Sequence, residues 1–250
     1  MFLIALIKVR GPDKRAIVKN GVAAFILLLL LSSCATAGHD LDKSTAHYQL
    51  GLSYVTENKM QLAFVEFHKA VELNSDNKEA LNMLGLVYLE FGDFQKAEES
   101  FLKAIRVDQC YSEAYSNLGA TYGRMGKWSD AISEFKTAAK NPLYTKPEIA
   151  YSGLGEAYYR LGRFDDAIDS YREALKRIPD FYHSYYGLAL CFNAQERYGD
   201  AGAAMMHAID LDPLFKGDRG KAADYFNTKR LEARSEELKD INDYLEILNY

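Results

Sequence analysis

The chain has 250 residues, of which 48% are hydrophobic and 26% are charged, and its formal net charge is −5 at pH 7. The first 33 residues contain five Lys or Arg and one Asp, so the remaining residues hold 25 basic and 34 acidic side chains, a net charge of −9. This acidic balance lacks the basic surface that binds phosphate backbones, so we expect no nucleic-acid partner.

The N-terminal segment has the three parts of a secretory signal. Five basic residues precede an uninterrupted apolar run over 22–31, and small residues follow the run. The run has ten residues, whereas a membrane-spanning helix needs about 20, so a stable transmembrane anchor is not expected. Residues 1–33 are therefore predicted to be a signal peptide that is removed.

The end of the apolar run decides the type of signal. Leu31, Ser32, Ser33 and Cys34 resemble a bacterial lipobox, in which the cysteine is acylated and becomes the new N-terminus. The resemblance implies a lipid on Cys34, followed by a short linker over 34–43. Alanine at position 35, instead of the aspartate that retains many lipoproteins in the inner membrane, implies the outer membrane. The alternative is an ordinary signal with an accidental cysteine.

Internal repetition dominates residues 44–215. The pentapeptides LGLSY, LGLVY, LGATY, LGEAY and LALCF begin at 50, 84, 118, 154 and 188, and two columns of alanine recur at the same intervals. The pattern resembles the tetratricopeptide repeat. This resemblance implies an all-α, right-handed solenoid of helix-turn-helix repeats. The five predicted repeats span 44–77, 78–111, 112–147, 148–181 and 182–215.

The residue types in the repeat have a packing explanation. A small residue at position 8 and alanines at positions 20 and 27 let helix backbones approach, while an aromatic residue at position 24 fills the space between them in most repeats. Gly92, Gly126 and Gly162 are expected in the turn between the two helices of their repeats, because glycine adopts turn conformations without strain.

Two segments depart from the regular repeat. The third repeat contains two extra residues, in a stretch where Pro142 and Pro147 prevent simple helix continuation, and we expect a loop extension there. After residue 215, Leu231, Leu238 and Leu245 recur every seven residues, which favours helices. Residues 216–250 are predicted to be a degenerate sixth repeat or a pair of capping helices, with a partner-binding helix as the alternative.

A groove is the predicted functional surface. In tetratricopeptide repeats the first helix lines the concave face, through positions 2, 5, 9, 12 and 13. The apolar and aromatic side chains at these positions are Tyr48, Leu52, Val55, Leu86, Leu89, Tyr159, Tyr186 and Leu190. An apolar concave surface suits an amphipathic helix or an extended peptide of a protein partner. The alternative is burial by neighbouring helices.

Two other kinds of site are disfavoured. Binding of acidic heat-shock-protein tails needs Lys and Asn where Tyr48 and Leu52 stand, and the scattered histidines form no HExxH motif. We therefore expect no enzyme, no cofactor besides the covalent lipid on Cys34 and no small-molecule substrate. Cys110 and Cys191 occupy different repeat positions, so a disulfide is not expected, and Cys191 is predicted to be a core residue.

Three features together resemble a narrower family. A lipobox, about six repeats in 250 residues and an N-P-x-Y insertion, here Asn141, Pro142 and Tyr144, are similar to the type IV pilus biogenesis lipoproteins of the PilF, PilW and Tgl group. The resemblance covers essentially the whole mature chain. It implies a pilotin, lipid-anchored at the periplasmic face of the outer membrane, that binds the pilus secretin and promotes its localisation and multimerisation for pilus assembly and twitching or gliding motility.

Two other classes stay open at this point. One is an adaptor lipoprotein in a different envelope assembly machine, such as polysaccharide export or outer-membrane protein assembly. The other is an accessory subunit of a peptidoglycan-modifying enzyme.

Overall fold

The computed structural model describes residues 40–250, and all regular structure in this part of the chain is helical. The chain divides into two compact units, with the boundary in the sequence between Ser75 and Asp76. The described part of the first unit contains a helical segment over 40–56 and α2 (Met60–Leu73). The predicted signal peptide and Cys34 lie outside the described residues. Residues 40–43, which the sequence assigned to the linker, are already helical.

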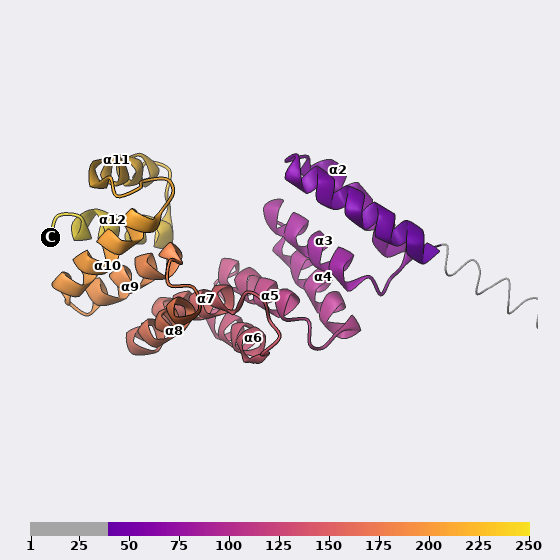
Figure 1. Cartoon of the computed structure of the whole chain (residues 1–250), viewed down its shortest axis with the longest axis horizontal. Coiled ribbons are helices and arrows are strands. Elements are labelled where there is room, and N and C mark those ends of the chain that lie inside the picture. The colour runs from indigo at the N-terminus through magenta and orange to yellow at the C-terminus, as the bar shows by residue number, and fades with distance from the viewer. Residues whose placement is uncertain (1–39) are drawn as a thin grey trace, which may run out of the picture. The chain divides into compact units, whose positions relative to one another are not determined.

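The second unit runs from α3 to α12 (Figure 1). Its repeats are pairs of antiparallel helices that pack against the next pair along the chain. The helices are α3 (Lys78–Glu90), α4 (Phe94–Val107), α5 (Ser112–Arg124), α6 (Trp128–Lys140), α7 (Pro147–Arg160), α8 (Phe164–Arg177), α9 (Tyr182–Ala194), α10 (Tyr198–Leu211), α11 (Arg219–Arg230) and α12 (Ser235–Ile247). The predicted fold class, an all-α solenoid of tetratricopeptide repeats, is confirmed. No helix within residues 40–250 is long and apolar enough to cross a membrane.

A left-handed residue makes the turn inside each repeat. Gly92, Gly126 and Gly162 have φ values of 76°, 72° and 70°, which confirms their predicted place in the turn. Asn58 and Glu196 stand at the same position of the first and fifth repeats and have φ values of 57° and 60°. The turn is therefore a property of the repeat, and these two residues adopt a conformation that side chains disfavour.

The predicted pairing of small and large residues is the basis of the core. A Cβ atom added to Gly85 would lie 2.5 Å from the Phe101 ring, and one added to Gly119 would lie 3.0 Å from Phe135. The aromatic ring thus occupies the space that the missing side chain leaves within its own repeat. Such close packing makes even one added methyl group costly.

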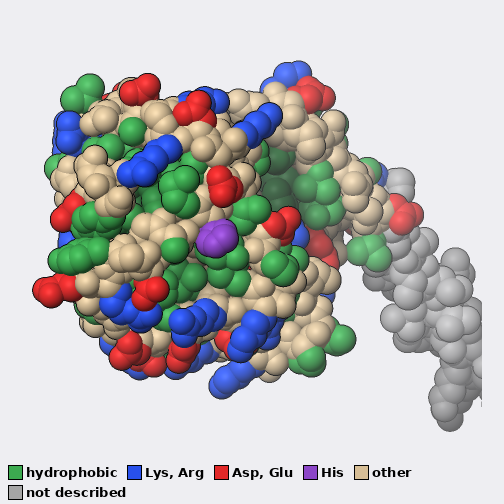
Figure 2. Space-filling model, turned by 60° about the vertical axis from the view of Figure 1, so that its left-hand side comes forward, with side chains coloured by type: hydrophobic (Ala, Val, Ile, Leu, Met, Phe, Trp, Pro, Cys, Tyr) green, Lys and Arg blue, Asp and Glu red, His purple; other side chains and the backbone are tan. Residues whose placement is uncertain are grey.

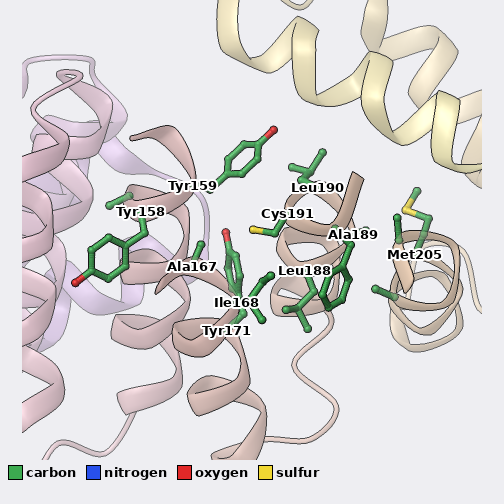
Figure 3. Packing of buried hydrophobic residues seen from close by; sticks show 14 of the residues in the cluster. Tyr158, Tyr159, Ala167, Ile168, Tyr171, Leu188, Ala189, Leu190, Cys191 and Met205 are labelled. Carbon is green, nitrogen blue, oxygen red and sulfur yellow. The ribbon is translucent and has the colours of Figure 1, made fainter. Parts of the chain in front are cut away.

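The same rings also join consecutive repeats. Gly153 on α7 faces the Phe135 ring of the preceding repeat, and Gly187 on α9 faces Tyr171. Figure 3 shows the Tyr171 ring between α8 and α9, beside Cys191. One buried aromatic residue therefore contacts both its own repeat and the next, which makes the core continuous along the stack.

The insertion in the third repeat is a fixed turn. The Asn141 side-chain Nδ2 donates to the Cys110 backbone carbonyl oxygen (3.0 Å) and to the Ser112 hydroxyl (2.8 Å), and the Asn141 side-chain Oδ1 accepts from the Leu143 backbone N–H (3.0 Å). Tyr144 is buried in the core, whereas the Leu143 side chain is 84% exposed. The extra residues therefore extend the loop, as expected, and also add an aromatic side chain to the core.

The C-terminal residues form the helix pair α11 and α12. Leu231 does not share a helix with Leu238 and Leu245, because α11 ends at Arg230 and Leu231 follows as its 76% exposed cap. Within α12, Ile241 is buried. The helix packs against α9 and α10, so its apolar side is covered by the repeats.

Candidate partner-binding groove

A cavity of about 730 Å³ lies along the first helices of the third, fourth and fifth repeats, α5, α7 and α9, and α12 forms part of its wall. Most of its lining residues stand at the repeat positions that were predicted to face the groove. Those residues are Ser116, Ala120, Gly123, Arg124, Ile149, Ser152, Glu156, Tyr159, Arg160, His183, Tyr186 and Leu190. In the face of the molecule that Figure 2 shows, hydrophobic side chains reach the surface in groups between charged ones.

An ion pair fixes α12 at one end of the groove. The Arg160 Nη1 and Nη2 atoms donate to the Asp240 Oδ1 and Oδ2 atoms at 2.8 and 2.5 Å, and the two side chains are 12% and 13% exposed. Burial opposes the charged form of Arg160, but its hydrogen bonds to Asp240 raise its pKa above the usual value. This two-point, charge-assisted contact sets the position of α12 against α7.

Hydrogen bonds and aromatic rings complete the covered end. Lys239 of α12 donates from Nζ to the Tyr159 hydroxyl at 3.1 Å. The Tyr186 ring meets the ring of Tyr244, also on α12, edge to face with their centroids 5.5 Å apart, an arrangement that adds to the gain from burial. The Tyr186 hydroxyl donates to Asp212 Oδ2 at 3.1 Å. Burial, and then the Asp212 carboxylate, raises the pKa of Tyr186, so this hydroxyl stays a neutral donor.

The other end of the groove, between α5 and α7, is open. Its residues are mostly small, with Ala120 and Gly123 on α5 and Ser152 on α7. Trp128, the only tryptophan in the chain, packs over Gly123, where an added Cβ atom would lie 3.0 Å from its ring. The open end therefore offers space beside an aromatic surface, which is a common setting for a bound side chain.

Charge and apolar surface meet at the open end. Arg124 is exposed at its edge, and within residues 40–250 its guanidinium has no carboxylate partner. Ile149 lines the same end and is 43% exposed. Glu156 also lines the cavity, but its carboxylate lies 3.6 Å from Arg160 and is attracted to that cation.

The structure brings three of the eight predicted groove residues together. Tyr159, Tyr186 and Leu190 line the cavity, at its covered end; Tyr159 and Leu190 are buried. Leu86 and Leu89 are half-buried and pack against the core around Phe101, outside this cavity.

The remaining three predicted residues belong to the first unit. Tyr48, Leu52 and Val55 are half-buried there, and the Tyr48 ring centroid lies 6.0 Å from that of Phe67. A role of any of the eight in binding a partner stays a prediction.

The sequence-based selection missed the polar part of the groove. Arg124 and Arg160 both stand at position 13 of their repeats, a groove-facing position, but only apolar residues were selected there. The repeat register was the signal that could have found them. Asp240 and Tyr244 carried no such signal, because they lie outside the five repeats and reach the groove only through the docking of α12.

The described residues hold neither a candidate metal site nor a disulfide. Residues 40–250 contain no group of three or more His, Cys, Asp or Glu side chains that could hold a metal ion. Cys110 and Cys191 are free thiols, the first exposed and the second buried, as predicted for Cys191. Burial raises the pKa of Cys191 to about 12, which makes it a poor nucleophile at neutral pH.

Family models agree with the architecture. Models of the tetratricopeptide repeat match residues 44–77, 78–109, 100–133, 117–180 and 153–214. The chain belongs to the tetratricopeptide repeat family. It is therefore a repeat scaffold for interactions between proteins.

Solved structures share the fold at low sequence identity. MamA is 25% identical, with a TM-score of 0.56, and the match covers 64% of this chain and 93% of that chain. PilW, described as a widely conserved type IV pilus biogenesis factor, is 22% identical, with a TM-score of 0.64 and coverage of 79% and 97%. PilF of Pseudomonas aeruginosa is 20% identical, with a TM-score of 0.62 and coverage of 82% and 98%. No curated protein sequence matches the chain.

Proposed function

We propose that this protein is an outer-membrane lipoprotein of the pilotin type, which binds the secretin of a type IV pilus and promotes its localisation and multimerisation. The observation that carries the proposal is the open end of the groove, a cavity at the groove positions that α12 leaves uncovered. The lipobox ending at Cys34 and the N-P-x-Y turn support the narrower assignment. The likeness to PilW and PilF supports it only through the fold, because both are under 25% identical.

The mechanism is that of a tethered adaptor. Acyl chains on Cys34 hold the chain at the membrane. Because the helical segment begins at residue 40, only five residues separate it from Cys34, and they span at most about 20 Å. A secretin segment bound in the groove is then confined near the membrane surface, which raises its effective concentration for assembly. Two requirements follow, a lipid at Cys34 and an accessible groove, and each can be removed separately.

The first requirement is tested in the native host. Heat-resistant secretin multimers are measured by immunoblot in a deletion strain, and in the same strain carrying wild type or Cys34→Ala. The proposal expects loss of multimers on deletion, rescue by wild type and no rescue by Cys34→Ala. Normal multimers in the deletion strain would refute the pilotin assignment and leave a repeat scaffold with another partner.

The second requirement is tested with two isoleucines of similar exposure. Ile149 is 43% exposed and lines the groove, whereas Ile178 is 39% exposed and does not line it. Ile149→Glu is expected to weaken co-purification of the secretin, and Ile178→Glu is expected to leave it unchanged. Equal binding by both variants, with circular dichroism like that of wild type, would remove the groove from the mechanism.

A second function stays an alternative because sequence identity does not single out a pilus role. MamA is 25% identical to this chain, and the two pilus proteins are 22% and 20% identical. The alternative is an adaptor in another envelope assembly machine. Secretin multimers that persist in the deletion strain, together with a different protein captured by wild type but not by Ile149→Glu, would favour it.

A further inference from the structure

Two arginines at equivalent positions of the groove have different surroundings. Arg124 and Arg160 are position 13 of the third and fourth repeats, at the C-terminal ends of α5 and α7, and both line the same cavity. Their backbones are therefore presented in the same way by consecutive repeats. Arg160 is bound at two points by Asp240, whereas Arg124 is exposed and meets no carboxylate of residues 40–250.

The partner of Arg160 comes from outside the five repeats. It is carried by α12, a helix rich in acidic residues, and Tyr244 one turn after Asp240 packs against Tyr186 in the groove. The charged side chains of the helix are Glu236, Glu237, Asp240, Asp243 and Glu246, with Lys239 as the basic one. The covered end of the groove thus holds an acidic helix chiefly through the Asp240 carboxylate and the Tyr244 ring. Glu236 Oε2 also lies 3.6 Å from Arg160 Nε, and Lys239 donates to the Tyr159 hydroxyl.

The open end has the same cation and more room. The groove positions that hold Tyr186 and Leu190 at the covered end hold Ser152 and Glu156 one repeat earlier. Trp128, which packs over Gly123 next to Arg124, supplies apolar surface there, and Ile149 lines the cavity at the start of α7. Glu156 is the acidic side chain that faces this space, and it lies within 3.6 Å of Arg160, which leaves the Arg124 charge uncompensated.

We propose that the open end of the groove binds an acidic helical segment of the partner protein, with one carboxylate on Arg124 and an apolar side chain one turn away on Trp128. The inference rests on the proposed function in placing the partner in this groove, and it adds the chemical class of the segment. Charge complementarity supports this inference, because α12 already places an acidic side chain, Asp240, on the equivalent arginine, Arg160. A bidentate contact between arginine and a carboxylate gives both affinity and orientation.

The test uses the mature full chain in detergent and a labelled peptide with the sequence of residues 235–250. Fluorescence anisotropy measures peptide binding, and Trp128 emission reports occupancy of the open end because no other tryptophan contributes. We expect saturable binding that Arg124→Gln weakens by about tenfold or more, a loss of about 1.4 kcal/mol. Arg172→Gln, at an exposed arginine on α8 outside the cavity, is the matched control and should bind like wild type.

A second peptide identifies the carboxylate. This peptide has Asn at the place of Asp240, and it should bind the wild-type chain as weakly as the original peptide binds Arg124→Gln. The Arg124→Gln chain should bind the two peptides with nearly equal affinity. Equal affinity of the original peptide for wild type and Arg124→Gln would overturn the proposal, because the peptide would then be replacing α12 at Arg160. Absence of saturable binding to wild type would overturn it as well.

These outcomes are separable from those of the secretin experiments. The titration contains no secretin, so a negative result refutes the acidic ligand while leaving the pilotin assignment to the multimer assay. A positive titration with normal multimers in the deletion strain would instead keep the acidic site and refute the pilotin assignment.

Discussion

The two ends of the groove are built by the same repeat and have different properties. At the covered end, α12 supplies Asp240 to Arg160 and Tyr244 to Tyr186, so groove positions become part of the core. At the open end, the equivalent Arg124 stays in solvent beside small residues. The repeat therefore provides the position, and whether that position binds a ligand or stabilises the fold depends on what lies across from it.

This difference between the two ends also explains which side chains the sequence predicted to line the groove. Aromatic residues at groove positions are concentrated where α12 docks, because Tyr159 and Tyr186 both contact that helix. The open end is lined by Ser152, Ala120 and other small residues that no hydrophobicity criterion would select. An apolar residue at a groove position can thus indicate packing against another helix of the same chain as readily as binding of a partner protein.

The largest effect on stability is expected from Tyr244→Ala at the covered end. The variant removes a ring whose centroid lies 5.1 Å from that of Phe226 and 5.5 Å from that of Tyr186. The loss should lower the free energy of unfolding by about 3 kcal/mol, measured by chemical denaturation. Tyr198→Ala, at a 46% exposed tyrosine, is the control. Equal effects of both variants would show that α12 contributes little to the core.

A smaller effect is expected from Arg160→Gln, and almost none from Arg124→Gln. The first variant leaves the Asp240 carboxylate, 13% exposed, without its cation, at a cost of about 2 kcal/mol after allowance for its residual exposure. The second variant changes an exposed side chain and should shift the free energy of unfolding by less than about 0.5 kcal/mol. Similar losses in the two variants would contradict the assignment of different roles to the two arginines.

Gly153→Ala tests how tightly the repeats are packed beneath the open end. Its Cβ atom would overlap the buried Phe135 ring, so we expect a loss of about 1 to 2 kcal/mol in the free energy of unfolding. Gly199→Ala on α10 is the control, because no atom lies within 4 Å of its added Cβ, and it should be neutral or slightly stabilising. A neutral Gly153→Ala would mean that the aromatic ring can move aside.

Thiol labelling compares an exposed cysteine with a buried one. In a Cys34→Ser chain at pH 8, the exposed Cys110 should react with a thiol reagent within minutes. Cys191 should react more than about 100-fold more slowly, because burial restricts access and raises its pKa to about 12, so that the thiolate is scarce. Tyr244→Ala is expected to increase the rate at which Cys191 reacts. Equal rates for the two thiols in the wild-type fold would contradict the buried position of Cys191.

Much of the fold could be predicted because its determinants are local and repeated. The spacing of the repeats located the helix pairs, and Gly92, Gly126 and Gly162 located the turns between them. The glycine at position 8 and the aromatic residue at position 24 could be paired from their constant separation. Leu231 shows the limit of such patterns, because a seven-residue spacing does not reveal that a helix ends at Arg230.

The candidate site was predictable only in part. The sequence by itself determined the solenoid, because each repeat packs chiefly on its neighbours and repeats the same small and large residues at fixed positions. Of the eight groove residues predicted from it, three line the cavity. Only the tertiary structure decided which groove positions are free. That choice depends on Arg160 and Asp240, 80 residues apart, and several other acidic residues on α12 could have supplied the carboxylate. The geometry of helix docking selected Asp240, and it left Arg124 exposed to solvent.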